Sequence, residues 1–298
     1  MSGRSRVSPE PSTGVLCMAY GSPDGEAGIE EYYTHIRGGR KPSPESLDEL
    51  KGRYRAIGGS PLTAITRAQA RAIGEKLGMP AFVGMKHAFP FIADGAAEAR
   101  QAGVTRLVGL PLAPHFAEMS LGAYQRSLEA AWPGELLFVR GFHDHPAFIQ
   151  AVQNLIRERL NDGRPDRLFF TAHSLPARIV AEGDGYVDRL LESCRLVAAG
   201  MELPEWEFAF QSASATGEPW LGPDLLSAIE SSGARDVLVC PIGFVADHLE
   251  ILYDLDVEAQ AFALDHGIKI RRAESFNTRP DFIAAMADVV SSAISAQV

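Results

Sequence analysis

Short apolar runs alternate with amphipathic helical segments along almost the whole chain, and this alternation restricts the fold more than any other feature. Eight runs have the length and apolar character of buried strands: Val15–Tyr20, Ala81–Lys86, Arg106–Leu112, Leu136–Arg140, Arg167–Ala172, Glu207–Gln211, Val237–Ile242 and Ile268–Arg272. Helical patterns separate nearly all of them, for example Ser43–Ala56, Ala64–Leu77, Pro146–Leu160 and Pro223–Ser231. Apolar strands joined through helices are typical of parallel sheets covered on both faces. The sequence therefore predicts an α/β fold.

Four of the predicted strands precede residue 145 and four follow it. We therefore expect two similar Rossmann-like halves, each a four-stranded parallel sheet flanked by helices, with a cleft between them. The expected halves are 14–145 and 146–298, and the last helix, Pro280–Ala296, is expected to pack back on the first half. Residues 1–13 are polar and rich in Ser and Pro, which predicts a disordered lead and no signal peptide.

Composition excludes several functional classes. Hydrophobic residues make up 46% of the 298 positions, which suffices for a globular core, and no apolar stretch reaches the length of a membrane span. The net charge of −10 disfavours a general nucleic-acid binder. The cysteines, Cys17, Cys194 and Cys240, are scattered and odd in number. This argues against a disulfide framework or a thiolate metal cluster and favours the cytoplasm.

Ligands of open parallel sheets bind beyond the carboxyl ends of the strands, so residues that follow the strands are candidates for a site. His173 is the clearest, because it ends an apolar strand and its imidazole takes up a proton or binds a metal near neutral pH. A hydrogen-bonded structural histidine is the alternative. His143 and His145 resemble a metal pair, but they precede Pro146 and are expected to form a plain loop at a helix start.

A row of acids follows the seventh predicted strand. On a regular α-helix, Glu250, Asp254 and Glu258 would lie at i, i+4 and i+8 on one face. Like charges at this spacing repel by about 0.2–0.5 kcal/mol per pair, and no Lys or Arg interleaves them. Such a row fits a path for a hydrated divalent cation, which prefers oxygen ligands. A solvated acidic surface is the alternative.

A basic stretch stands out in this acidic chain. Residues 37–55 carry a net charge of +3, which leaves −13 for the rest. The cations of this stretch are Arg37, Arg40, Lys41, Lys51, Arg53 and Arg55. Arginines bind carboxylates and phosphates in bidentate fashion, and aromatic side chains such as Tyr20 and Tyr33 can hold a flat anionic ligand. Two charged surface helices would explain the same pattern. No glycine-rich nucleotide-binding fingerprint is present.

Three long motifs, found in family order, resemble the ferrochelatases, the enzymes that insert ferrous iron into a porphyrin. They are TAHSLP at 171–176, WLGPD at 220–224 and GFVADHLEILYD at 243–254. Two N-terminal segments, MAYGSP at 18–23 and YYTHIR at 32–37, resemble the Gram-positive type. That type acts on coproporphyrin III and yields Fe-coproporphyrin III, or coproheme. The protoporphyrin type usually has a Gly or Leu-Gly run where Tyr20 stands.

The resemblance implies roles for individual residues. His173 and Glu250 match the pair that faces the metal and the pyrrole nitrogens, and Tyr20 matches the residue that reaches the iron from the opposite face. The positions that hold the macrocycle and its propionates are matched by Arg37, Arg53, Tyr54, Ser60 and Tyr124. Asp254 and Glu258 match an outer acidic row linked to metal delivery. The chain departs from the family at Gly38, which replaces the second Arg of a pair, and at Gly59–Ser60, a turn one residue shorter than usual.

The resemblance also implies partners. Iron enters as a substrate, and no permanently bound cofactor is expected. Some relatives hold a [2Fe–2S] cluster through C-terminal cysteines, and none is expected here because no cysteine follows Cys240. We expect a monomer that binds coproporphyrin III and Fe²⁺, with a coproheme decarboxylase as a transient partner. Two alternatives stay open, a chelatase for protoporphyrin IX or sirohydrochlorin and a non-enzymatic haem or metal carrier.

Overall fold

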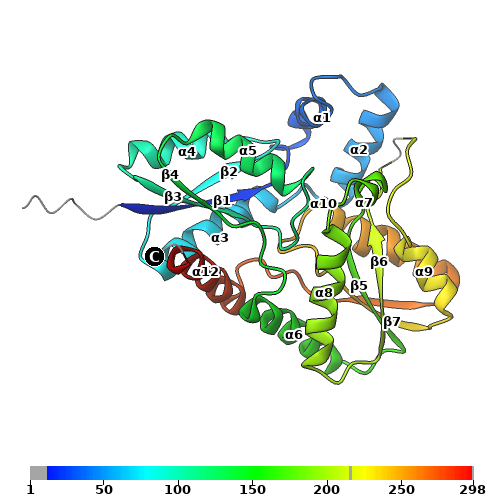
Figure 1. Ribbon diagram of the computed structural model, residues 1–298. Coiled ribbons are helices and arrows are strands. Elements are labelled where there is room, and N and C mark those ends of the chain that lie inside the picture. Colours follow the sequence, from blue (N-terminus) through cyan, green and yellow to red (C-terminus); the bar gives the residue numbers. More distant parts are fainter. Residues whose placement is uncertain (1–11, 215–216, 297–298) are drawn as a thin grey trace, which may run out of the picture.

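The computed structural model of the protein describes residues 12–214 and 217–296. Within these ranges the strands are β1 (Thr13–Ala19), β2 (Ala81–Met85), β3 (Arg106–Pro111), β4 (Glu135–Phe138), β5 (Arg167–His173), β6 (Glu205–Gln211), β7 (Asp236–Cys240) and β8 (Lys269–Arg272). They form two four-stranded sheets of order β2-β1-β3-β4 and β6-β5-β7-β8, and all neighbours are parallel (Figure 1). The predicted α/β fold of two parallel-sheet halves is confirmed.

Helices connect these strands. They are α1 (Ile29–Ile36), α2 (Pro44–Ala56), α3 (Leu62–Leu77), α4 (Ile92–Gln101), α5 (Leu121–Ala131), α6 (Pro146–Leu160), α7 (Arg178–Ala181), α8 (Tyr186–Ala199), α9 (Leu225–Ser232), α10 (Leu249–Leu252), α11 (Ala259–His266) and α12 (Pro280–Ser295), with a 3-10 turn η1 (Glu26–Gly28) and a π-helix η2 (Asp254–Glu258). The predicted helices end within two residues of these bounds. At α2 the reason is local, because Ser43 caps the first turn and Pro44 begins it.

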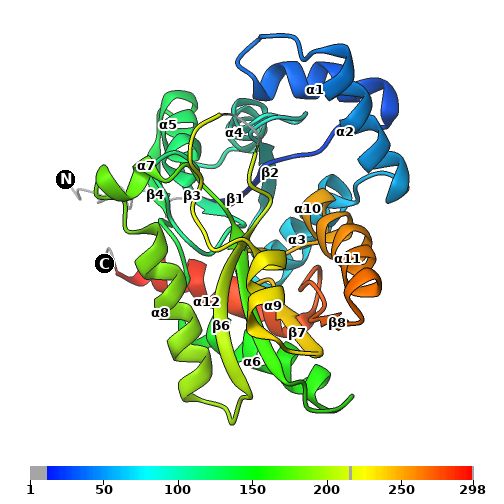
Figure 2. The same cartoon turned by 90° about the vertical axis from the view of Figure 1, so that its right-hand side faces the viewer.

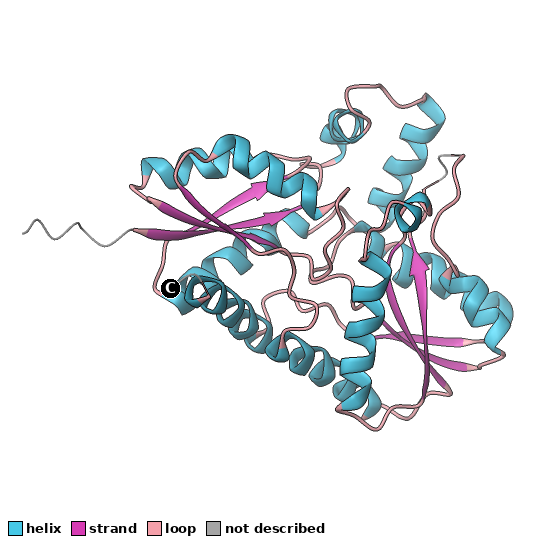
Figure 3. Cartoon of the chain, in the orientation of Figure 1, coloured by secondary structure: helices cyan, strands magenta, loops and turns pink. Residues whose placement is uncertain are grey.

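Helices cover both faces of each sheet (Figure 3). In the second sheet, Phe169 and Val239 pack against α9 and α11, whereas Phe170 and Cys240 pack on the opposite side against α6 and α8. The side chains of a strand alternate between its two faces, so burial on both faces requires the continuous apolar runs seen in the sequence. In the first sheet, α4 and α5 cover one face and α3 covers the other.

The largest hydrophobic cluster contains residues of both halves. Cys17 of β1, Ile73 of α3, Phe170 of β5 and Met286 of α12 all belong to it and are fully buried. Helix α12 packs against α3 and α6, so the C-terminal helix touches the first half as well as the second (Figure 1). The division at residue 145 stays a prediction. The predicted lead lies mostly outside the described residues, and Thr13 already begins β1.

Helices α1 and α2 form a hairpin that stands out at one end of the protein, next to α10 (Figure 2). Its small core of Ile29, Tyr32 and Tyr54 packs against Leu249 of α10, which ties the hairpin to the second half. No helix of the described ranges is long and apolar enough to cross a membrane.

Candidate active site

His173 and Glu250 meet at the carboxyl edge of the second sheet. His173 is the last residue of β5, and Glu250 lies in the first turn of α10. Nδ1 of His173 lies 3.1 Å from Oε2 of Glu250, and each side chain is about one-third exposed. The ring of Trp220 stands edge-on to the imidazole, with 6.2 Å between ring centroids. The fold thus brings together the imidazole and the carboxylate that the sequence motifs paired, and both keep a face open to solvent.

Each member of this pair stabilises the charged form of the other. Burial acts to lower the pKa of His173, but the Glu250 carboxylate outweighs it and raises that pKa above its ordinary value. Burial also opposes ionisation of Glu250, yet His173 and then His248 hold the pKa of this carboxyl well below its usual range. Nε2 of His248 lies 3.7 Å from the same carboxylate oxygen. The carboxylate is therefore ionised at neutral pH, beside an imidazole whose protonated form it stabilises.

The acids Glu250, Asp254 and Glu258 do not lie on one regular α-helix, so the helix type expected for this segment is wrong. Residues Asp254–Glu258 form a π-helix, in which the N–H of Glu258 donates to the carbonyl of Tyr253, five residues back, at 2.8 Å. Asp254 is buried, whereas Asp256 and Glu258 are exposed. The acids differ in burial, but Glu250 and Glu258 both lie close enough to Asp254 to raise its pKa.

Asp254 is the acid of this segment that the fold buries. Its carboxylate accepts a hydrogen bond from the Ser212 hydroxyl. Burial raises the pKa of Asp254 to about 6, with Glu250 and Glu258 adding to the shift and Ser212 and Arg53 opposing it. Arg53 of α2 therefore lies close enough to lower the pKa of Asp254. The sequence pattern did not place this positive charge near the acids.

Asp254→Asn is expected to stabilise the fold at high pH. A carboxyl whose pKa is raised on folding contributes full stability below its unfolded pKa of about 3.9, and this contribution is lost as pH rises through about 6. Asn stays neutral and keeps an acceptor for Ser212. We expect a gain of about 2–3 kcal/mol in unfolding free energy at pH 8 and none near pH 4. Urea unfolding at the two pH values measures the difference, and an equal gain at both would contradict it.

Tyr20 stands at the carboxyl edge of the first sheet, directly after β1, with 42% of its surface exposed. Its ring packs on the ring of His87 with 4.5 Å between centroids, and Nζ of Lys86 lies 5.9 Å from the tyrosine ring centre. Desolvation by the neighbouring protein, and then the charge of Glu250, raise the pKa of Tyr20. The phenol is therefore within electrostatic reach of the His173–Glu250 pair, although the two sites belong to different sheets.

The sequence patterns did not single out a pair of histidines beside Tyr20. Nδ1 of His87, which follows β2, lies 2.9 Å from Nδ1 of His35 on α1. Burial lowers the pKa of His87 to about 4, and Lys86 and His35 add to the effect, so this ring is neutral at physiological pH. One ring must then donate and the other accept. The sequence offered one sign of this site, the position of His87 just beyond an apolar strand. The residues around His87 in the sequence do not show that it contacts His35.

The predicted arginines lie on the α1–α2 hairpin. Arg37 is exposed just after α1, with its guanidinium carbon 5.7 Å from the ring centre of Tyr33, and it makes no ion pair with another described residue. Arg53 pairs with Glu49 at 2.9 Å and lies 5.1 Å from the ring centre of Tyr253. Arg37 is thus free for an anionic ligand, whereas Arg53 is already engaged by one carboxylate.

The remaining predicted binding residues are less open. Tyr54 and Tyr124 are each 6% exposed, because Tyr54 belongs to the core of the hairpin and Tyr124 to the core of the first half. Ser60 follows Gly58 and Gly59, whose positive φ angles of 71° and 91° make the tight turn that glycine favours. The Ser60 hydroxyl accepts a hydrogen bond from the N–H two residues on, at 3.3 Å. Each tyrosine therefore exposes little of its surface to a ligand.

The second candidate metal pair is a loop, as predicted. Nε2 of His143 lies 3.1 Å from Glu192, and His145, directly before α6, lies 3.8 Å from Asp288. Across residues 12–214 and 217–296, no cluster of three or more His, Cys, Asp or Glu side chains is arranged to hold a metal ion. A metal at His173 and Glu250 would therefore complete its coordination from substrate or solvent.

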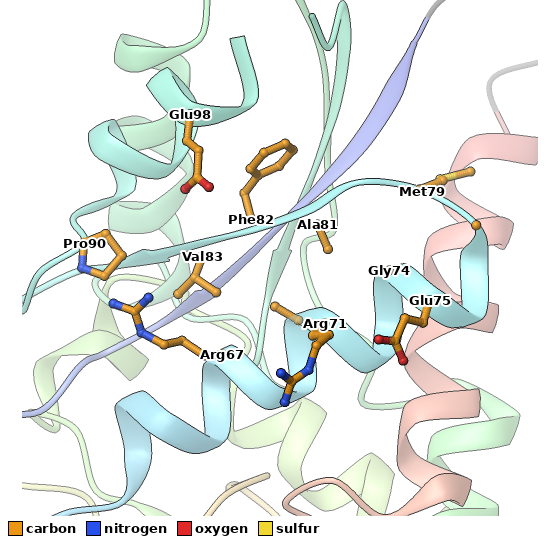
Figure 4. Close-up of a pocket in the computed structure, with 12 residues that line it drawn as sticks. Arg67, Arg71, Gly74, Glu75, Met79, Ala81, Phe82, Val83, Pro90 and Glu98 are labelled. Atoms are coloured by element: carbon orange, nitrogen blue, oxygen red, sulfur yellow. The ribbon is translucent and has the colours of Figure 1, made fainter. Parts of the chain in front are cut away.

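A hollow of 540 Å³ lies away from these residues, between α3, β2 and α4 (Figure 4). Arg67 and Arg71 of α3 stand on one side of it and Glu98 of α4 on another (Figure 4). Its lining contains none of the predicted site residues. The cleft predicted between the halves stays a prediction.

Known proteins share the motifs and the fold. The sequence profile of the ferrochelatase family matches residues 12–294. The chain belongs to the ferrochelatase family. It is therefore a metal-inserting chelatase. The coproporphyrin III ferrochelatase of Bacillus subtilis is 42% identical over 298 aligned residues, which cover 93% of this chain and 96% of that protein. The ferrochelatase of Herpetosiphon aurantiacus is 38% identical over 299 residues, covering 94% and 98%.

Solved structures agree on the arrangement of the two halves. SirB from Bacillus subtilis with Fe³⁺ superposes on this ferrochelatase with a TM-score of 0.60 at 11% identity, covering 96% of this chain and 97% of that one. CbiX, the terminal enzyme of siroheme biosynthesis in denitrifying bacteria, gives 0.58 at 14% identity, covering 94% and 98%. At such low identity the likeness establishes the fold alone.

Proposed function

We propose that this ferrochelatase inserts Fe²⁺ into coproporphyrin III to give coproheme, as a step of haem biosynthesis. The observation that carries the proposal is the His173–Glu250 pair at 3.1 Å, with Tyr20 within reach of its charge. Relatives that match 93% of the chain at 41% and 40% identity are coproporphyrin III ferrochelatases of Bacillus pumilus and Halalkalibacterium halodurans, which supports this substrate.

Iron insertion replaces two pyrrole N–H protons by one Fe²⁺, so the site must remove two protons and strip water from the ion. Neutral His173 accepts a pyrrole proton, and the adjacent carboxylate of Glu250 stabilises the imidazolium that forms and passes the proton outward. Tyr20 approaches the iron from the opposite face. Asp254 and Glu258 follow Glu250 in the chain and serve metal delivery, and both Glu250 and Glu258 lie close enough to Asp254 to raise its pKa.

The choice of ring follows from charge. Coproporphyrin carries four carboxylates and protoporphyrin carries two, so the more anionic ring suits the basic stretch 37–55. The exposed guanidinium of Arg37 binds a propionate, and Arg53, Tyr54, Ser60 and Tyr124 contribute further contacts to the macrocycle. Turnover on coproporphyrin III well above that on protoporphyrin IX is the expected consequence.

Arg37→Ala is expected to raise KM for coproporphyrin III by about tenfold while kcat falls by less than about twofold, because a propionate contact is made equally before and during insertion. Arg67→Ala is the matched control, since Arg67 is also an exposed arginine but lies on α3 beside the separate hollow. Steady-state kinetics of the three proteins decide the matter, and an unchanged KM in Arg37→Ala would remove Arg37 from substrate binding.

The proposal includes the setting of the reaction. Three unpaired, buried cysteines favour the reducing cytoplasm. The enzyme acts as a monomer, uses no permanently bound cofactor and holds no [2Fe–2S] cluster. Its product leaves the site with four carboxylates, so a coproheme decarboxylase is the partner proposed to receive it.

An anaerobic insertion assay tests the function. Purified protein and Fe²⁺ are mixed with coproporphyrin III, protoporphyrin IX or sirohydrochlorin, and insertion is followed by the loss of porphyrin fluorescence. Multiple turnovers on coproporphyrin III are expected. Faster turnover on another ring would overturn the substrate, and stoichiometric binding that stops after one equivalent would leave a carrier in place of an enzyme.

A further inference from the structure

The side chain of Gln211 connects the strand of His173 to the helix of Glu250. Gln211 ends β6 and is 4% exposed. Its Oε1 accepts a hydrogen bond from the hydroxyl of Thr171 at 2.8 Å, and its Nε2 donates to the backbone carbonyl of Glu250 at 2.8 Å. A carbonyl can only accept, so these partners fix which end of the amide is nitrogen and make the Thr171 hydroxyl the donor.

The main chain of Gln211 holds the end of β5, where His173 lies. In the β5–β6 ladder Gln211 lies opposite His173, and its carbonyl accepts a hydrogen bond from the N–H of Ser174 at 2.8 Å. One buried residue therefore anchors the end of β5 through its backbone and the start of α10 through its side chain.

Helix α10 begins a helical segment that continues through η2 into α11. It has four residues, and the side chain of His248 at its N-cap makes no capping hydrogen bond. The ends of a helix fray most readily, so a first turn without a side-chain cap is held in place by contacts from outside the helix. The Gln211 amide is the side-chain hydrogen-bond donor that reaches the Glu250 carbonyl from the neighbouring strand.

We propose that Gln211 is a positioning residue that sets the separation of the His173 imidazole from the Glu250 carboxylate, and through it the rate of metal insertion. The inference rests on the proposed function of that pair. Because Gln211 touches the backbone of Glu250 and not its carboxylate, it acts on geometry and takes no part in proton transfer. A misplacement of about 1 Å at a reacting group lowers a rate by up to about a hundredfold, so a change in this bridge affects kcat before it affects porphyrin binding.

Two substitutions break the bridge from opposite ends. Gln211→Met keeps the length of the side chain and removes both hydrogen bonds, and Thr171→Val keeps its shape and removes one. We expect kcat to fall by about tenfold in the first and about threefold in the second, with KM for the porphyrin within about twofold of the wild type. Thr171→Ser restores the hydroxyl and is expected to regain most of the lost rate.

Thr66→Val is the matched control for Thr171→Val. Thr66 is fully buried, and its hydroxyl donates at 2.8 Å to a carbonyl of its own helix, α3. Its kcat is expected to equal that of the wild type. If Gln211→Met does not fold, the Thr171 pair decides the matter alone. A wild-type kcat in Thr171→Val, or equal losses in Thr171→Val and Thr171→Ser, would overturn the inference.

The two failures are distinguishable because all variants are assayed with the ring that the wild-type protein turns over fastest. A wild type that prefers a ring other than coproporphyrin III overturns the proposed substrate but leaves the Gln211 test intact. A wild type active on coproporphyrin III with unaffected bridge variants overturns the role of Gln211 alone.

Discussion

His173→Ala is expected to lower kcat for iron insertion by about a thousandfold while the protein stays folded. The substitution removes the imidazole that accepts a pyrrole proton, and a positioned general base contributes about 10²–10⁴ in rate. The fold tolerates the loss, because the side chain is about one-third exposed and the Glu250 carboxylate keeps His248 at 3.7 Å. Anaerobic fluorescence assays with coproporphyrin III give the rates, and thermal unfolding by circular dichroism gives the stability.

His143→Ala is the control for this prediction. His143 also pairs with a glutamate, Glu192, at 3.1 Å, but it lies in the loop before α6 and not at a strand end. Its removal is expected to leave kcat within about twofold of the wild type. A His173→Ala protein that retains more than about a tenth of the wild-type kcat would show that another group accepts the proton.

The architecture was predictable because its signals are local. A strand covered on both faces must be apolar at successive positions, as in Leu168-Phe169-Phe170, and a helix start such as Ser43-Pro44 is readable from two residues. Strand order and the packing of α12 against α3 depend on contacts between distant segments. The expectation about α12 came from its place as the last element, with no residue pattern behind it.

The acidic segment shows that an i, i+4 spacing does not predict the type of helix. An i, i+4 spacing is compatible with any helix, but the turn at Asp254–Glu258 is wide, with the Glu258 N–H bonded five residues back. The burial of Asp254 and its hydrogen bond from Ser212 belong to this irregular turn, and Ser212 lies on a different strand end. Because the partner is remote in sequence, the helical pattern contained no trace of the change.

The residues of the site likewise fall into those that the sequence marks and those that only the structure shows. His173, Glu250 and Tyr20 were found because motifs mark them, and the fold brings the first two to 3.1 Å. Gln211 lies in a strand whose sequence reads as ordinary core, and its function becomes visible only when Thr171 and Glu250 appear at its two amide atoms. Supporting residues of this kind are specified by their three-dimensional neighbours, so no local pattern of the sequence marks them.

Glu250→Gln separates charge from shape at the same site. Gln keeps the side-chain volume and leaves the backbone carbonyl to its bond from Gln211. It removes the negative charge that stabilises the imidazolium of His173 and the oxygen that would share the proton. We expect kcat at neutral pH to fall by about a hundredfold, with a smaller change in KM for the porphyrin.

The pH profile of Glu250→Gln provides the sharper test. In the wild type Glu250 outweighs burial and raises the pKa of His173; without that carboxylate, burial prevails and lowers it. His173 must be neutral to accept a pyrrole proton, so the acid limb of the kcat profile should move to lower pH in the variant. The rate is measured between about pH 5 and 9, on both sides of the ordinary histidine pKa of about 6.5. Glu192→Gln, which breaks the comparable pair with His143, should leave the limb in place. Removal of the Glu250 carboxylate must shift the pKa of His173. An unmoved acid limb in Glu250→Gln would therefore mean that the group titrating in the profile is not His173.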